Sequence, residues 1–309
     1  MPIDPLIRKR IEEKKKRLDR VRPLPELAIR RLKKRFDILL SYNSNALEGN
    51  TLTEGETRMV IEDGITIGGK SLKEHFEAKN HKKAIDFIEK AVSQRREIDK
   101  EVVCKLSEII LDRTVEEEVG AYRKRRVHVE GASFVPARPT IIEEKMDEFF
   151  RWLKRTKLHA IEKSAIAHEK FTLIHPFIDG NGRIARLLSS IILMQAGYPP
   201  IIILKTERMK YISTLDKAHQ LRYKPFVDFF ARCVERSLTI YLDALSEAKD
   251  EEEYRPIAEV AKNSRYSPEY ISLLARKGRI DVLKTGRNWM ISERSLRDYI
   301  STKRKYVKR

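Results

Sequence analysis

One twelve-residue segment decides the fold, and it reads His175-Pro-Phe-Ile-Asp-Gly-Asn-Gly-Arg-Ile-Ala-Arg186. Two glycines, Gly180 and Gly182, let the backbone approach an anion closely because neither carries a side chain. Apolar residues at helical spacing follow over 184–192, so a helix begins here and points its free N–H groups at the same place. The segment therefore predicts a phosphate-binding turn between two apolar helices.

The charged residues of this segment suit a polyphosphate. Arg183 and Arg186 lie one helical turn apart and can share one phosphate chain through forked hydrogen bonds. Two arginines at a helix N-terminus oppose the helix dipole, a cost that a bound anion offsets. Asp179 offers a carboxylate oxygen to Mg²⁺, which binds through one or two carboxylates and the phosphates of its substrate. His175 titrates near neutrality and can take a proton from a hydroxyl nucleophile.

Each of these residues by itself has an ordinary explanation. A histidine before a proline is commonly a polar turn residue, and Asp-Gly-Asn-Gly is commonly a loop. Their convergence within twelve residues favours a functional site. A P-loop NTPase is excluded, because no Gly-Lys-Ser or Gly-Lys-Thr follows the glycines.

The composition is that of a globular protein. The 309 residues suit about two domains of roughly 150 residues, and 41% apolar with 36% charged residues argues against global disorder. The longest nearly apolar stretch, Leu187–Leu204, is interrupted by polar residues and two prolines and is therefore no membrane span. The N-terminus lacks an apolar leader, and two cysteines, Cys104 and Cys233, make no disulfide scaffold. We expect a cytoplasmic protein.

The net charge of +18 is concentrated at the two ends of the chain. Residues 1–36 hold 14 Lys and Arg against 5 Asp and Glu, and residues 254–309 hold 15 against 5. The middle is nearly neutral. This distribution indicates that acidic partners such as nucleic acid meet the ends. For the N-terminal run, a solvated helix face is an equal alternative, because Ile7, Ile11 and Leu18 recur at helical spacing.

Spacings of three and four between apolar residues predict an all-α body. Helices are expected over 27–47, 141–153 and 161–173, with a capping box at Thr53 and Glu56 and an N-cap at Asp99. Alternation over 127–135 predicts an exposed β-hairpin, and further alternation lies at 280–291. We expect the chain to divide into an N-terminal helical region (1–95), a core that holds the phosphate-binding turn (96–248), a charged linker (249–255) and a small C-terminal domain (256–309).

The twelve-residue segment resembles the H-x-F-x-(D/E)-G-N-G-R-x-x-R motif of Fic-domain proteins and matches every fixed position. The resemblance extends over roughly residues 30–245 and includes Gly120-Ala-Tyr-Arg123, which is similar to the family's flap region. It implies an all-α Fic fold with a small β-hairpin flap at 127–135 that aligns a target segment. The implied reaction transfers AMP from ATP to a Ser, Thr or Tyr hydroxyl of a target protein and releases pyrophosphate.

The resemblance also implies a role for each residue of the segment. His175 is the general base for the target hydroxyl, Asp179 is the Mg²⁺ ligand, and Phe177 is an apolar anchor under the loop. The other positions bind ATP, with the α-phosphate held by Gly180, Asn181 and Gly182 and the β- and γ-phosphates by Arg183 and Arg186. Gly182 argues against the family's phosphotransferase branch, in which a lysine stands at this position.

A second motif, Ser44-Asn-Ala-Leu-Glu48-Gly49, is similar to the (S/T)-x-x-x-E-(G/N) inhibitory motif of Fic proteins. By itself this pattern says little, because it only places two polar groups on one helix face. The resemblance implies that residues 27–48 form an inhibitory helix on which Glu48 pairs with Arg186 and so removes the partner of the γ-phosphate. Whether Glu48 also supports removal of AMP is left open.

The C-terminal residues have helix-turn-helix spacing. Residues 257–263 and 267–274 read as two short helices, the second capped by Ser267, and two strands around Gly286 and a helix over 295–300 follow. The pattern resembles winged helix-turn-helix domains of the excisionase and MerR type. It implies binding of double-stranded DNA, with phosphates contacted by Arg276, Lys277, Lys284 and Arg287 and a basic tail at 303–305. A winged helix that binds protein is the alternative, and Trp289 is expected in the core.

Together these features predict a protein adenylyltransferase that is inhibited by Glu48 and fused to a DNA-binding module, with ATP as substrate and Mg²⁺ as cofactor. The alternative is a transcription regulator in which the Fic body senses nucleotide with little transferase turnover. No membrane partner is expected. A homodimer is one option for an oligomeric state that the sequence leaves open.

Overall fold

The computed structural model describes residues 3–24, 26–116, 118–129, 134–252, 254–262, 264–277, 280, 282–285, 288–292, 296–297 and 299–300. The chain forms two compact units. The first consists of Met1–Leu24 and Ile29–Tyr241, and the second of Pro25–Ala28 and Leu242–Arg309.

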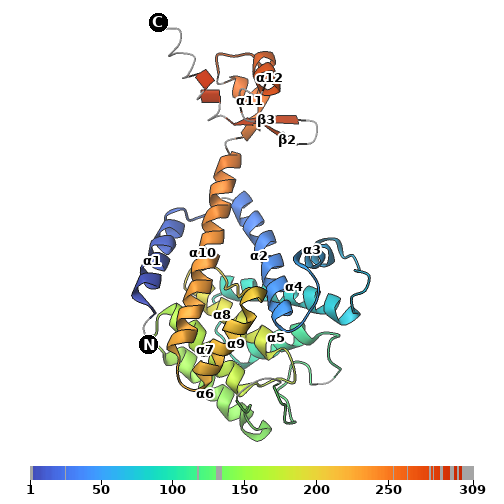
Figure 1. The fold of residues 1–309 in the computed structure, drawn as a ribbon, viewed down its shortest axis with the longest axis vertical. Helices are drawn as coiled ribbons and strands as arrows, with labels where there is room; N and C mark the ends of the chain where they lie inside the picture. The colour runs from blue at the N-terminus through green and yellow to red at the C-terminus, as the bar shows by residue number, and fades with distance from the viewer. Residues whose placement is uncertain are drawn as a thin grey trace. The chain divides into compact units, whose positions relative to one another are not determined.

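The first unit is helical, as the apolar spacing predicts (Figure 1). The helices that lie wholly or mostly in it are α1 (Pro5–Arg20), α2 (Glu26–Leu47), α3 (Glu54–Arg58), α4 (Leu72–Ser93), α5 (Lys100–Leu111), α6 (Ile142–Arg155), α7 (Ala160–Ile174), α8 (Asn181–Gln195), α9 (Arg208–His219) and α10 (Lys224–Glu252). Short turns of other helical types are η1 (Met59–Asp63), η2 (Pro139–Ile141) and η3 (Lys205–Glu207).

Local capping sets several of these helix ends. The Thr53 hydroxyl accepts from the Glu56 N–H at 3.2 Å, and the Glu56 carboxylate accepts from the Thr53 N–H at 2.7 Å. This reciprocal pair confirms the predicted capping box at the start of α3. The Asp99 carboxylate likewise accepts from the Val102 N–H at 2.9 Å, which confirms the predicted N-cap of α5.

The pair α7 and α8 forms the centre of the first unit. Buried residues cover nearly every face of α8, because α4, α5 and α7 all pack against it. Its polar side chains are enclosed as well, since Arg183, Arg186 and Ser189 are all buried. Where α7 leads into α8, the buried ring of Phe177 lies 6.4 Å from that of Phe171. This packing holds the turn between the two helices in place.

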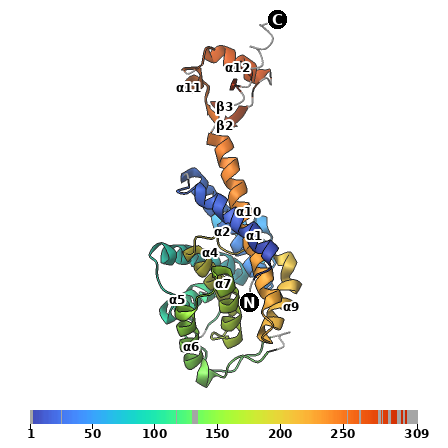
Figure 2. The same ribbon diagram turned by 90° about the vertical axis from the view of Figure 1, so that its left-hand side faces the viewer.

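Helix α1 runs alongside α10 (Figure 2). Its apolar stripe, Ile7, Ile11 and Leu18, is buried as the helical spacing predicts. On the same helix, Arg10 makes two hydrogen bonds to the Glu235 carboxylate, at 2.8 and 2.9 Å, and Lys14 makes a third at 3.0 Å. Part of the basic N-terminal run therefore attaches α1 to the body of the first unit.

The hairpin predicted for 127–135 does not appear in the described residues. Residues 127–129 and 134–135 form no strand, and residues 130–133 lie outside the described part of the chain. The segment is held in another way, because the guanidinium of Arg123 takes the carbonyls of Arg125 and Ala137, one on each side. The residues on either side of the segment are thus tied together through one side chain.

Two of the boundaries drawn from the sequence look different in the structure. Most of the stretch expected to be a charged linker, 249–255, is helical, because α10 continues to Glu252. Lys and Glu are strong helix formers, so a charged run at the end of a helix readily extends it. The boundary at 95 and 96 separates no compact unit either, since α4 packs against α5 within the first unit.

Across the described ranges of the chain, no helix is both long enough and apolar enough to cross a bilayer.

The second unit contains β1 (Tyr254–Pro256), α11 (Ile257–Lys262), α12 (Pro268–Arg276), β2 (Val282–Thr285) and β3 (Asn288–Ser292). The strands form an antiparallel sheet in the order β1-β3-β2, with Lys284 opposite Trp289. The Ser267 hydroxyl accepts from the Tyr270 N–H at 3.3 Å, which confirms it as the N-cap of α12. Strand β1 was not expected from the sequence, and the helix expected at 295–300 lies partly outside the described residues.

A small core holds this unit together. It contains Val260, Ile271, Leu274 and Ile291, from both helices and from β3. Trp289 does not belong to it: the residue is 40% exposed, so its predicted place in the core is wrong. Tryptophan is large and seldom fully buried, and the core of this unit is small.

Candidate active site

His175 ends α7 in the left-handed conformation, with φ of +53°. A residue with a side chain adopts this conformation at a cost of about 1 kcal/mol or more, and such strain is concentrated at functional sites. The ring Nδ1 lies 3.2 Å from the Thr172 carbonyl oxygen and donates to it, which leaves Nε2 as the acceptor. Burial lowers the pKa of His175 to about 4. The imidazole is therefore neutral at pH 7 and able to accept a proton.

Arg123 fastens the backbone around this histidine. Its buried guanidinium donates to three carbonyl oxygens: that of His175 at 2.8 Å, that of Arg125 at 2.9 Å and that of Ala137 at 2.6 Å. Its own N–H donates to the Pro176 carbonyl at 2.9 Å. The Arg123 side chain thus connects the end of α7 with the residues on both sides of the predicted flap.

The turn after His175 is closed by Asn181. Its amide oxygen accepts from the Phe177 N–H at 3.0 Å, and its amide nitrogen donates to the Phe177 carbonyl at 2.8 Å. Because both ends of the amide are used, the side chain shapes the turn. The second N–H of its amide and the Asn181 backbone N–H remain for the α-phosphate contact that the resemblance implies. Gly180 precedes it with φ of +76°, and a Cβ here would meet Ile110 at 3.0 Å.

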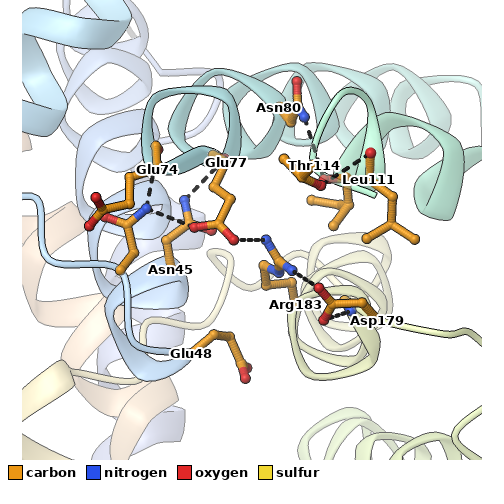
Figure 3. A network of polar contacts seen from close by, with 12 residues as sticks. Asn45, Glu48, Glu74, Glu77, Asn80, Leu111, Thr114, Asp179 and Arg183 are labelled. Atoms are coloured by element: carbon orange, nitrogen blue, oxygen red, sulfur yellow. Dashed lines mark hydrogen bonds and ion pairs between the residues drawn. The ribbon is translucent and has the colours of Figure 1, made fainter. Parts of the chain in front are cut away.

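Arg183 lies between two carboxylates (Figure 3). Its side chain is 3% exposed, and its terminal nitrogens lie 3.2 Å from Glu77 Oε1 and 3.4 Å from Asp179 Oδ2. Asp179 is 43% exposed, whereas the Glu77 side chain is 12% exposed. Arg183 is therefore neutralised from inside the protein by Glu77 and from the mouth of the turn by Asp179.

Arg186 meets the end of α2. Its Nη2 donates to Glu48 Oε1 at 2.7 Å and to the Ser44 carbonyl at 2.9 Å, and its Nε donates to the Ser44 hydroxyl at 2.9 Å. Burial opposes the charge of Arg186, but its pKa is raised because Glu48 lies against it. The structure thus contains the pair between Glu48 and Arg186 that the resemblance implies, across 138 residues of sequence.

The Glu48 carboxylate also reaches the start of α8. A Cβ added to Gly182 would lie only 2.3 Å from Glu48 Oε1, so the carboxylate occupies the space that the missing side chain leaves open. An anion at the N-terminus of a helix is stabilised by the free N–H groups and by the helix dipole. Glu48 therefore sits where an anionic ligand of this turn is expected.

The residues proposed to bind DNA belong to the second unit. Arg276, in the last turn of α12, and Lys277, its C-cap, are both exposed. Lys284 is on β2. Arg287 lies outside the described residues, as does the basic tail at 303–305.

The residues at the turn suit a Mg²⁺·ATP complex. The Asp179 carboxylate is a hard oxygen ligand at an exposed position, which is the donor that Mg²⁺ takes from a protein when phosphates and water supply the rest. Arg183 and Arg186, on the same face of α8, supply two positive charges for the phosphates.

Sequence reasoning gave no role to three residues that shape the site. Arg123 was part of a quoted motif, but nothing in its spacing shows that it reaches three carbonyls. Glu77 is one polar residue among many on α4. Phe134 lies with its ring 6.5 Å from that of His175 and 4.2 Å from that of His219, and both contacts depend on the fold.

Comparison with known proteins places the chain in a family. Residues 97–193 match the model of the Fic/DOC family. The protein adenylyltransferase Fic of Drosophila persimilis is 40% identical over 223 residues, which cover 71% of this chain but only 44% of that protein. This chain thus matches less than half the length of that relative.

Two solved structures are similar in fold and in sequence. A Fic domain containing signaling protein from Bacteroides thetaiotaomicron has a TM-score of 0.72 and 30% identity, and the match covers 77% of this chain and 98% of that one. Fic-1 from C. elegans has a TM-score of 0.71 and 32% identity, covering 79% of this chain and 74% of that one. With these matches and the turn described above, the chain belongs to the Fic/DOC family.

Proposed function

We propose that this protein is a protein adenylyltransferase that transfers AMP from ATP to a side-chain hydroxyl of a target protein. The observation that carries the proposal is the arrangement of one neutral histidine, one exposed carboxylate and two arginines around the start of α8. A relative at 40% identity bears the name of this activity.

The proposed reaction is a nucleophilic displacement at the α-phosphorus of ATP. The oxygen of the target hydroxyl forms a bond to this phosphorus, and the bond from the phosphorus to the bridging oxygen of the β-phosphate breaks. Nε2 of His175 takes the hydroxyl proton, and pyrophosphate leaves with the electron pair of the broken bond. Backbone N–H groups at the start of α8 face the negative charge on the α-phosphate.

The arginines and Asp179 hold the leaving group in this scheme. Arg183 and Arg186 bind the β- and γ-phosphates through charge-assisted hydrogen bonds. Asp179 is the protein ligand of Mg²⁺, which when bound neutralises the charge that builds up on pyrophosphate. Gly182 leaves the space above the helix start open for the nucleotide.

Glu48 inhibits the proposed reaction. In the structure its carboxylate occupies the start of α8 and pairs with Arg186 at 2.7 Å, so ATP cannot place its γ-phosphate on that arginine until Glu48 leaves. The helix that carries the motif, α2, is the inhibitory helix of this proposal.

The test is a labelling assay with ATP that carries its label on the α- or the γ-phosphate. The Glu48→Ala variant, incubated with Mg²⁺ and lysate protein whose own kinases have been inactivated, should leave the α-label on protein and no γ-label. Glu48→Ala combined with His175→Ala is the matched control and should leave neither. Transfer of the γ-label would make the protein a kinase, contrary to the proposal.

The same assay tests a second function, a nucleotide-sensing regulator that binds DNA. This candidate is favoured by the α11, α12 and β2-β3 arrangement of the second unit, with Arg276 and Lys277 exposed at the end of α12. If Glu48→Ala binds Mg²⁺·ATP yet labels no protein, including itself, the sensor function replaces the transferase. DNA binding by the second unit is part of both candidates, and both are compatible with a homodimer.

A further inference from the structure

Glu77 touches both the arginine at the start of α8 and the chain that follows the inhibitory helix. Its Oε1 lies 3.2 Å from Arg183, and its Oε2 accepts from the Asn50 amide at 2.9 Å. Its backbone carbonyl accepts from the Asn45 amide at 3.1 Å. One carboxylate oxygen thus accepts a hydrogen bond and the other lies at ion-pair distance from Arg183, and together these contacts hold the side chain in its position on α4 (Figure 3).

Arg183 depends on such a partner. Its side chain is 3% exposed, and removing the partner of a buried charge costs several kcal/mol in general. In the described part of the chain, Glu77 and Asp179 are the two carboxylates that pair with it. If Glu77 were absent, the buried guanidinium would be neutralised by Asp179 alone.

Asp179 has a competing task under the proposed function, since its carboxylate is the ligand for Mg²⁺. An oxygen that is paired with a buried arginine is a poorer metal ligand, because the metal has to compete with that ion pair. We propose that Glu77 is a positioning residue that neutralises Arg183 from inside the protein and thereby frees Asp179 for the metal. This inference rests on the proposed function.

The test measures how much Mg²⁺ strengthens ATP binding. All variants carry Glu48→Ala, and the dissociation constant of ATP is measured by calorimetry in EDTA and in excess Mg²⁺. The ratio of the two constants is the gain due to the metal. We expect Glu77→Gln to lower this gain at least fivefold. In EDTA it should bind ATP as tightly or more tightly, because one negative charge near the phosphates is gone.

A variant that binds ATP more weakly in Mg²⁺ but not in EDTA indicates a positioning role for Glu77, because damage to the fold would weaken ATP binding in both. Glu74→Gln is the control for the loss of a nearby charge, since Glu74 lies on the same helix but bonds to Thr51 and Ser71. It should leave the gain unchanged. In an Arg183→Gln background, Glu77→Gln should no longer alter the gain, whereas a long-range field effect would persist there.

Further variants separate the possible failures. Glu77→Asp keeps the charge but shortens the reach, and we expect an intermediate gain from it even if Glu77→Gln is too unstable to measure. A full gain in Glu77→Asp and Glu77→Gln would overturn the inference. Asp179→Asn should abolish the gain. If it does not, the metal assignment in the proposed function is wrong, and if Glu48→Ala binds no ATP, the proposed nucleotide site itself is wrong.

Discussion

Replacing Glu48 by Ala should strengthen the binding of Mg²⁺·ATP by roughly tenfold to thirtyfold. The structure supplies the magnitude. ATP must displace a charge-assisted hydrogen bond of 2.7 Å, a kind of bond worth about 1.5–3 kcal/mol net. Arg186 is 6% exposed but Glu48 is 41% exposed, so solvent screening favours the lower part of that range, about 1.5–2 kcal/mol. Each 1.4 kcal/mol changes an affinity about tenfold.

Isothermal titration calorimetry with Mg²⁺·ATP and purified protein measures this effect directly. Glu54→Ala is the matched control, because Glu54 is an exposed carboxylate in the first turn of α3 and should change the affinity less than twofold. In an Arg186→Ala background, Glu48→Ala should gain less than about threefold, since the bond it breaks is already missing. An unchanged affinity in Glu48→Ala, or an equal gain with and without Arg186, would refute the argument.

Three other predictions concern the base, the backbone around it and the second unit. His175→Ala should abolish transfer and keep Mg²⁺·ATP affinity within about threefold. With His175 present, the single-turnover rate should stay level from pH 8 to 6 and fall toward pH 4. The reason is that the pKa of His175 is lowered from 6.5 to about 4, so the neutral base persists to lower pH. Half-loss of the rate near pH 6.5 would contradict this assignment. Arg123→Lys should lower the free energy of unfolding in urea by about 2 kcal/mol or more and reduce the transfer rate at saturating ATP. The reason is that a lysine ammonium cannot bond to the three carbonyls at once. A variant with unchanged stability and rate would show that Arg123 does not position the backbone around His175. Replacing Arg276 and Lys277 by Ala in the full chain should weaken binding to all DNA duplexes about equally. The slope of log affinity against log salt concentration should also become shallower, by about 0.9 for each phosphate that the variant no longer neutralises. Fluorescence anisotropy at several salt concentrations measures both, and no DNA binding at low salt would favour the protein-binding alternative.

The features that could be predicted from the sequence are local ones. The turn of residues 175–186 is contiguous, so glycines, charges and the following apolar helix can be read together. The N-cap at Asp99 and the capping box at Thr53 depend on residues three positions apart. The helix over 27–47 was predicted within one residue, because apolar residues recur at helical spacing over most of its length.

The sequence was misleading where local pattern competes with contacts from elsewhere. The alternation over 127–135 suggests strands, yet residues 127–129 and 134–135 form none, while residues 130–133 lie outside the described part of the chain. Trp289 has the residue type of a core position but is 40% exposed. A local sequence pattern predicts which faces of an element are apolar. It does not predict which side chains from distant parts of the chain contact those faces.

Only the tertiary structure decided how the charges of the site are distributed. The Glu48–Arg186 pair was implied by resemblance, but its place over Gly182 depends on how α2 meets α8. The two carboxylates that flank Arg183 come from α4 and from the turn before α8, so no spacing in the sequence identifies Glu77. The sequence determines which titratable groups exist, while burial and neighbours set their charge, because desolvation and pairing act through space.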